Sequence, residues 1–462
     1  MHTLDLPAVA TVADGGHWIL FSVLIGVLLA IGFAIRARRR PEATYKRGAL
    51  VLQGARARRY ARSRGESSVT LAGVAIDPLE ETKHFKLIGS TGTGKSTAIR
   101  QLMGDALRRG DRAVVADPDA GYATRFFDRG RGDVILNPFE PDSVRWDAFA
   151  EIRNPYDVEQ LAASLIASGE GGSGREWRGY ARTFLTSVAR RCYQHGQRDT
   201  AELWRLLLIA SSDELRPLVA GTPAQPFLEP ENARMFGSIR SVTSSAVAAL
   251  EYVSAQTGAP FSVRDWVRTG RGSLFMPYRA DQIAALRSAI AAWMRLAIFE
   301  AMSGPEADRR LWFIVDELDA LGNIDGLKDA LARLRKFGGR CVLGFQSIAQ
   351  VSSTYGPGDA QTLIENCGNT LILRCSSSEH GGTSQFASRL IGEREIVRQQ
   401  KSRSRDRAGL FAARPARRST NVSDQHVTEI AVLPSELEQL PDLCGYLKTA
   451  ASAAWLKVCL SR

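Results

Sequence analysis

Short apolar runs alternate with helix-like patterns along most of this 462-residue chain. Continuous apolar runs are typical of strands buried on both faces, and they occur at 84–88, 113–116, 133–136, 272–278, 311–315, 340–345 and 369–375. Apolar positions at helical spacing predict helices between them, at 95–108, 281–302 and 325–336. Strands alternating with helices predict an α/β fold with a mostly parallel, doubly wound sheet.

A block without any strand pattern interrupts this alternation at residues 155–256. Three helical series of apolar positions begin there, at Val158, Trp177 and Phe236. We therefore expect an all-α domain inserted into an α/β domain made of residues 69–154 and 257–462. The Trp and Tyr side chains of the block fit a helical core better than a platform for stacking bases.

The first seventy residues have a different character. Residues 18–35 contain no charge, and as a helix they would span about 27 Å, enough for a bilayer core. The tail 1–17 contains acids but no Lys or Arg, whereas four arginines occur within 36–40. The positive-inside rule then predicts a single transmembrane helix with an external tail and a cytoplasmic main domain.

Positive charge is concentrated in two segments. The formal net charge is +11, whereas residues 36–65 alone carry +10 and residues 394–418 carry +7, so the remainder is net negative. We expect a basic juxtamembrane linker at 36–68, which fits either anionic lipid headgroups or a nucleic-acid path. Residues 402–419 are predicted to form a flexible loop between two strands, either in contact with phosphates or simply solvated.

The six cysteines lack zinc-site spacing, which predicts buried thiols in a reducing compartment.

A phosphate-binding loop follows the apolar run 84–88. Its pattern Gly-x-x-x-x-Gly-Lys-Ser has a strand before it and a helix after it, as a P-loop requires. The glycines allow backbone N–H groups to face phosphate oxygens, Lys95 can reach the β- and γ-phosphates, and Ser96 can bind Mg²⁺. The predicted residues for ATP and Mg²⁺ are Gly89, Ser90, Thr91, Gly92, Thr93, Gly94, Lys95, Ser96 and Thr97.

Three polar residues follow other predicted strands. Asp316 follows the apolar run 311–315 and is suited to the metal, and Glu317 is suited to orient or deprotonate a water. Gln346 stands at the end of the run 340–345. Because ligands bind beyond the carboxyl ends of parallel strands, one site can collect them with the P-loop. The pattern predicts an ATPase that turns over repeatedly.

Longer segments resemble the type IV secretion coupling proteins of the TraD/TraG-like group. The resemblance covers about residues 45–462 and rests on "ETKHFKLIGSTGTGKSTAIRQL", "DVILNPFEPDSVRWDAF", "FIVDELDALGNIDGLKDALARLRKFGGRCVLGFQS" and "AVLPSELEQLPDLCGYL". It implies a hexameric, RecA-like ATPase anchored in the bacterial inner membrane. Such proteins bind single-stranded DNA and link the relaxase–DNA complex of the relaxosome to the components of the secretion channel.

The resemblance also implies two residue roles. A glutamine at the position of Gln346 senses the γ-phosphate, and an arginine at the position of Arg335 reaches a neighbouring subunit's nucleotide. Arg333, Lys336 and Arg340 compete for the second role, and an exposed helix face explains each of them without any function. Family members usually have two N-terminal membrane helices, whereas this chain shows one, which puts the expected contacts with the channel in doubt.

Three other functions remain open from the sequence. A membrane scaffold or substrate receptor would bind ATP with little turnover, which the pattern of Lys95, Asp316 and Glu317 disfavours. A double-stranded DNA translocase of the chromosome-partitioning type would share the fold. An ATPase for protein secretion alone would hydrolyse ATP without responding to DNA.

Overall fold

The structure is a computed structural model that describes residues 43–61, 69–168, 172–306, 309–378, 381–405 and 418–461. The chain divides into two compact units, a smaller one with residues 43–48 and 393–429 and a larger one with residues 49–392 and 430–461. The expected membrane helix at 18–35 and the tail before it lie outside the described residues. Within the described residues, no helix is both long enough and apolar enough to cross a bilayer.

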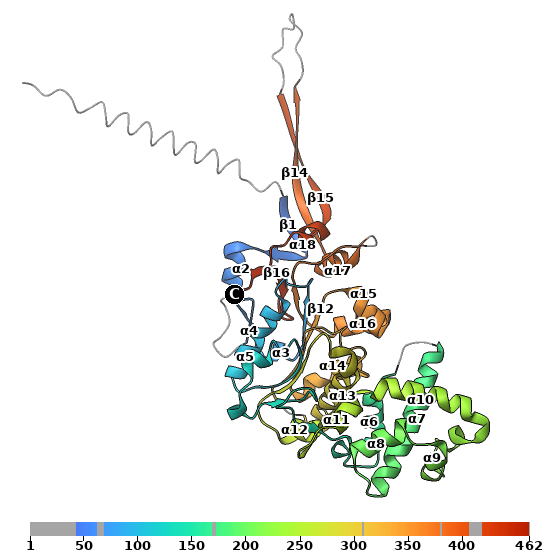
Figure 1. Cartoon of the computed structure of the whole chain (residues 1–462). Helices are drawn as coiled ribbons and strands as arrows, with labels where there is room; N and C mark the ends of the chain where they lie inside the picture. The colour runs from blue at the N-terminus through green and yellow to red at the C-terminus, as the bar shows by residue number, and fades with distance from the viewer. Residues whose placement is uncertain are drawn as a thin grey trace, which may run out of the picture. The chain divides into compact units, whose positions relative to one another are not determined.

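A ten-stranded sheet forms the centre of the larger unit, in the order β2-β17-β16-β13-β5-β12-β11-β6-β10-β7 (Figure 1). Neighbouring strands run parallel except at the β13–β16 and β16–β17 pairs. The expected mostly parallel sheet is therefore confirmed. The strands are β2 Leu50–Leu52, β5 Phe85–Ile88, β6 Arg112–Pro118, β7 Val134–Ile135, β10 Leu274–Tyr278, β11 Leu311–Val315, β12 Gly339–Phe345, β13 Asn369–Ile372, β16 Cys444–Lys448 and β17 Ala454–Cys459.

Helices cover both faces of this sheet because successive side chains of its strands point to opposite sides. In β6, Val114 packs into a core with Trp293 of α13, whereas Val115 packs into a second core with Leu102 of α4. The helices around the sheet are α2 Gly54–Ala61, α3 Pro78–Glu81, α4 Lys95–Arg108, α5 Ala123–Phe126, α12 Val263–Thr269, α13 Ile283–Ala301, α14 Leu327–Leu334, α15 Ile348–Tyr355, α16 Pro357–Glu365, α17 Gly382–Ile391 and α18 Pro434–Glu438. Two small sheets pair β3 Thr70–Leu71 with β4 Val74–Ala75 and β8 Arg145–Trp146 with β9 Pro260–Phe261.

Helices alone occupy the described residues between 157 and 254, and several of them gather at one end of the larger unit (Figure 1). They are α6 Asp157–Leu165, α7 Gly172–Gln194, α8 Thr200–Leu208, α9 Ser212–Val219, α10 Ala233–Val247 and α11 Ala249–Ser254, with two short 3₁₀ turns. Phe184 is fully buried, and Trp177 and Tyr180 pack against the same core. That core continues to the sheet, and the exact boundaries of an inserted domain stay a prediction.

The smaller unit is a three-stranded antiparallel sheet in the order β1-β14-β15, with β1 Ala43–Gly48, β14 Glu393–Arg405 and β15 Arg418–Ile430. Opposite charges meet across its strands, because Glu395 accepts from Lys46 and Glu429 accepts from Arg394. The prediction of a flexible loop at 402–419 is wrong at both ends, because residues 402–405 belong to β14 and residues 418–419 belong to β15. Residues 406–417 lie outside the described residues. Likewise, residues 43–61 of the expected linker form β1, β2 and α2.

The expectation that all six cysteines are thiols is wrong for two of them. Cys444 and Cys459 stand opposite each other in the β16–β17 pair and form a disulfide, with their Cα atoms 4.1 Å apart. Their partnership follows from the strand register, which spacing along the chain does not reveal. The four remaining cysteines are free and buried, at positions 192, 341, 367 and 375.

Candidate nucleotide-hydrolysis site

The P-loop joins the end of β5 to the start of α4 at the carboxyl edge of the parallel strands. Gly92 and Gly94 adopt φ values of +76° and +117°, a region that L side chains rarely occupy. A Cβ on Gly94 would also lie only 2.8 Å from Cδ2 of Leu443. Ser90 N–H donates to the carbonyl of Arg374 at 2.8 Å, and the Thr93 hydroxyl donates to the Ser90 carbonyl at 2.8 Å. The loop is thus shaped by backbone contacts that favour glycine at two points.

Lys95 is buried beneath this loop. Its Nζ donates to the carbonyls of Gly89 and Ser90, at 2.7 and 3.2 Å. Burial lowers the pKa of this ammonium, although nearby Asp316 and Glu317 oppose the effect. A cation held by neutral carbonyls within a loop of phosphate-binding shape is well placed to exchange those contacts for phosphate oxygens.

The residues expected to hold Mg²⁺ lie in direct contact. Ser96 Oγ donates to Asp316 Oδ2 at 2.6 Å, and the second oxygen of Asp316 has no hydrogen-bond partner among the described residues although it is buried. An unpartnered buried carboxylate oxygen is unfavourable unless a cation or water satisfies it. A hydroxyl and a carboxylate are the hard oxygen ligands that Mg²⁺ prefers, so the residues present fit this ion.

Gln346 connects the P-loop to Glu317. Its Nε2 donates to Glu317 Oε1 at 3.0 Å, and its Oε1 accepts from the Thr91 hydroxyl at 2.7 Å. Burial raises the pKa of Glu317, and the neighbouring charge of Asp316 raises it further. A raised pKa makes this carboxylate a stronger base near neutral pH. The structure therefore brings Thr91, Lys95, Ser96, Asp316, Glu317 and Gln346 together.

Arg335 does not lie at this edge. It begins the 3₁₀ turn η5 (Arg335–Phe337), directly before β12, whose seven residues carry the chain about 20 Å to Gln346. Arg335 is exposed and forms no ion pair within the described residues. Arg340, one of its competitors, is buried and paired with Glu81, which excludes it from reaching a ligand on another molecule. Arg333 and Lys336 are exposed like Arg335.

Tyr122 is a site residue that the sequence did not suggest. Its hydroxyl donates to Asp316 Oδ2 at 2.7 Å, and its own backbone N–H donates to Asp117 at the end of β6. A tyrosine four residues after the end of β6 has no recognisable sequence pattern. The only available signal was Asp117, which ends the strand 113–116 at the same sheet edge.

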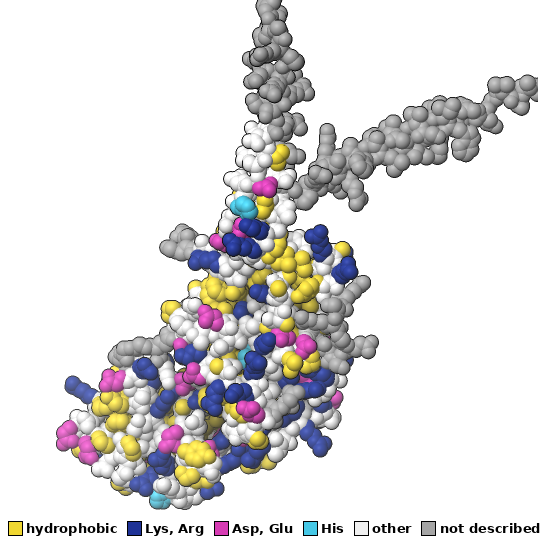
Figure 2. Space-filling view, turned by 180° about the vertical axis from the view of Figure 1, so that it is seen from behind, with side chains coloured by type: hydrophobic (Ala, Val, Ile, Leu, Met, Phe, Trp, Pro, Cys, Tyr) yellow, Lys and Arg dark blue, Asp and Glu magenta, His cyan; other side chains and the backbone are white. Residues whose placement is uncertain are grey.

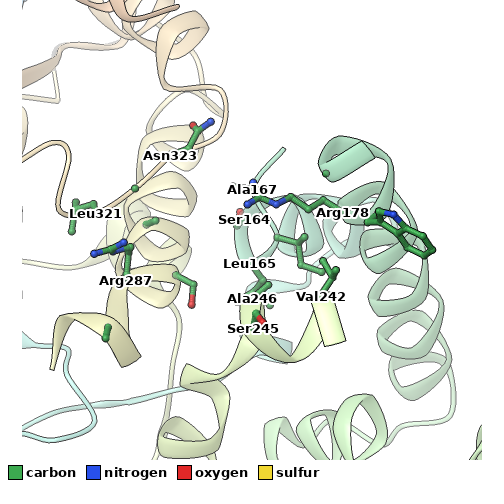
Figure 3. A pocket seen from close by; sticks show the side chains of 17 residues that line it. Ser164, Leu165, Ala167, Arg178, Val242, Ser245, Ala246, Arg287, Leu321 and Asn323 are labelled. Carbon is green, nitrogen blue, oxygen red and sulfur yellow. The ribbon is translucent and has the colours of Figure 1, made fainter. Parts of the chain in front are cut away.

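Two pockets lie near these elements. A pocket of about 560 Å³ adjoins the P-loop and is lined by Gly92, Thr97 and Arg100, among others. A second pocket of about 620 Å³ contains no P-loop residue and lies between α6, α7, α10 and α13. In Figure 3 the Arg178 side chain extends from α7 toward Ser164 and Ala167 at the end of α6.

A family model matches most of this chain, and curated proteins are similar to it. The family model described as the type IV secretion-system coupling protein DNA-binding domain matches residues 68–461. The coupling protein TraD of Escherichia coli (strain K12) is 30% identical over 390 residues, which are 83% of this chain and 53% of that protein. The Rhizobium rhizogenes protein VirD4 is 24% identical over 69% of this chain and 48% of its own length. The chain thus spans about half the length of the curated relatives that it matches.

Solved structures of the conjugative coupling protein TrwB are similar over most of the described fold. An unbound form has a TM-score of 0.81 and 33% identity, covering 90% of this chain and 93% of that one. TrwB with the ATP analogue ADPNP and TrwB with ADP and Mg²⁺ both have a TM-score of 0.79 and 32% identity, covering 90% of this chain and 94% of theirs. The expected family and the expected RecA-like α/β fold are confirmed. The chain belongs to the family of type IV secretion-system coupling proteins.

Proposed function

We propose that this protein binds single-stranded DNA and couples a relaxase–DNA complex to a type IV secretion channel, with ATP hydrolysis driving DNA transport. The observation that carries the proposal is the assembly of Lys95, Asp316, Glu317 and Gln346 at one sheet edge in a chain of this family. The proposed assembly is a homo-hexamer anchored by residues 18–35 in the bacterial inner membrane.

ATP and Mg²⁺ are the proposed ligands, as ADPNP, ADP and Mg²⁺ are in TrwB. Lys95 would bind the β- and γ-phosphates, and Ser96 and Asp316 would hold the metal ion, which supplies charge neutralisation on the phosphates. Glu317 orients the attacking water and accepts its proton. Gln346 would report the γ-phosphate to Glu317, and its hydrogen bonds to both Thr91 and Glu317 support this role.

Hydrolysis in this proposal depends on assembly. Arg335 lies at the amino-terminal end of β12 and the nucleotide site lies at the carboxyl end, so Arg335 cannot serve the site of its own chain. An exposed arginine without an ion-pair partner in the described residues is free to enter an adjoining copy's site. There it would stabilise charge on the transferring phosphoryl group.

No single basic stripe marks a DNA path on the face of the described residues that Figure 2 draws. On the face of the larger unit drawn in Figure 2, Lys and Arg side chains are interspersed with Asp and Glu. Arg178 and Arg287, which line the pocket of Figure 3, are candidates for contacts with phosphates on the helical side of the larger unit. Because such contacts release counterions, DNA affinity is expected to fall steeply with salt.

The test is steady-state ATP hydrolysis by the purified full-length protein in detergent, with and without oligonucleotides. We expect turnover to rise with single-stranded DNA and to rise more than linearly with protein concentration. Turnover that ignores DNA would contradict the proposal and favour a protein-secretion ATPase. Nucleotide binding without turnover would favour a scaffold or receptor, and stronger stimulation by duplex DNA would favour a double-strand translocase.

A further inference from the structure

The hydroxyl of Tyr122 lies against the carboxylate that is expected to hold Mg²⁺. It donates to Asp316 Oδ2 at 2.7 Å, and both residues are almost completely buried, with exposed fractions of 1% and 3%. Water cannot replace this donor without a rearrangement of the core around it. The contact joins the turn after β6 to the end of β11, two neighbouring parallel strands.

Tyr122 is itself held firmly. The Asp117 carboxylate accepts from the backbone N–H groups of Tyr122 and Ala123, at 2.9 and 2.7 Å, and so fixes the start of α5. The guanidinium of Arg100 lies 5.7 Å from the centre of the Tyr122 ring. A side chain fixed at its backbone and at its ring can hold its hydroxyl at one point.

The two carboxylate oxygens of Asp316 have different hydrogen-bond environments as a result. Oδ2 accepts from both Tyr122 and Ser96, whereas Oδ1 accepts from no group among the described residues. Two donors on one oxygen fix the rotation of the carboxylate and leave the other oxygen available. When Ser96 turns to a metal ion, Tyr122 would remain as the donor that keeps this orientation.

From this geometry we propose that Tyr122 is a positioning residue, which orients Asp316 for the metal ion of the nucleotide site. The inference rests on the proposed function, because it assumes that the P-loop binds a Mg²⁺–nucleotide complex. Tyr122 touches neither nucleotide nor metal in this scheme and acts only through Asp316. Partners in the outer shell of a metal site typically change metal affinity by about 10–100-fold.

The test compares metal binding with metal-free nucleotide binding in Tyr122→Phe. Mn²⁺, a spectroscopic substitute for Mg²⁺, is titrated into the full-length protein saturated with ADP and followed by electron paramagnetic resonance. We expect Mn²⁺ affinity to fall about 10-fold or more, whereas ADP affinity in EDTA stays within twofold of the wild type. Asp117→Asn, which loosens the anchor but keeps the hydroxyl, is expected to shift Mn²⁺ affinity in the same direction by less.

Tyr355→Phe is the matched control. It also removes a buried tyrosine hydroxyl, but one that contacts the backbone of Gly322 and Ile324 rather than Asp316. A similar loss of thermal stability in both variants with unchanged Mn²⁺ affinity would overturn the role of Tyr122. A wild type that binds Mn²⁺–ADP without hydrolysing ATP would contradict the proposed function alone, and a wild type that binds no nucleotide would overturn both.

Discussion

At the amino-terminal edge of the ten-stranded sheet, the buried charges clustered around Glu81 are paired, whereas at the carboxyl edge the charges of the nucleotide site are left incomplete. On the first edge Glu81 accepts from Arg109 and Arg340, and Asp111 accepts from Arg109 and from the indole of Trp312. On the second edge, within the described residues, Lys95 donates hydrogen bonds to backbone carbonyls and to no carboxylate, and one oxygen of Asp316 has no hydrogen-bond partner.

We interpret the difference as one between charges that stabilise the fold and charges that bind a ligand. Burying charges is costly unless each is paired and hydrogen-bonded, so a complete network is what a structural site requires. An incomplete network at the other edge costs stability, and the natural explanation is that a ligand completes it. Substitutions in the paired cluster should therefore lower the free energy of unfolding, whereas substitutions at the nucleotide site should lower ATP turnover and leave stability nearly unchanged.

The largest effect on stability is expected from Arg340→Ala. It leaves the buried carboxylate of Glu81 without one of its two cations and should lower the free energy of unfolding by about 3–5 kcal/mol. Arg335→Ala, five positions earlier and exposed, is the matched control and should change stability by less than about 0.5 kcal/mol. Chemical denaturation measures both. An Arg340→Ala protein of normal stability would remove the distinction between the edges.

Lys95→Ala is expected to show the opposite signature. We expect ATP turnover to fall by about 100- to 1,000-fold with little loss of folding stability, because the P-loop that carries both carbonyls is exposed at Thr91 and Gly92 and water can reach it. Lys86→Ala is the matched control, since Lys86 is also buried and donates to two carbonyls, those of Ile364 and Cys367. It should destabilise the fold instead. Phosphate release and thermal unfolding of both variants decide the question.

A smaller effect is expected from pH at His84, near the amino-terminal edge. Burial lowers the pKa of this imidazole from 6.5 to about 4, and its ring contacts the carbonyl of Leu331 and the N–H of Cys341. Because the unfolded chain binds a proton more readily, stability contributed by the neutral ring is complete above pH 6.5 and is lost as pH falls toward 4. The loss is about 3 kcal/mol in total. Denaturation midpoints measured from pH 7 to 4 should fall less steeply in His84→Gln.

Local patterns predicted the elements closest to the nucleotide. The helix at 95–108 and the strand at 311–315 have the expected bounds, because a P-loop and a continuous apolar run are local signals. Tyr122 and the Cys444–Cys459 disulfide were not predicted, since each depends on which strands are neighbours. The antiparallel pairs formed by β16 were missed for the same reason. Arg335 stays a prediction, because its partner would lie on another copy of the chain.

The central claim is that ATP is hydrolysed between adjoining copies, and mixing two inactive variants tests it most directly. Lys95→Ala retains Arg335 but lacks a working P-loop, and Arg335→Ala retains the P-loop but lacks the arginine. In mixed assemblies formed from equal amounts, about a quarter of the interfaces would combine an intact P-loop with an intact arginine if subunits mix at random. The account predicts that the mixture hydrolyses ATP well above either variant alone. A mixture no more active than the mean of the two separate proteins would contradict it.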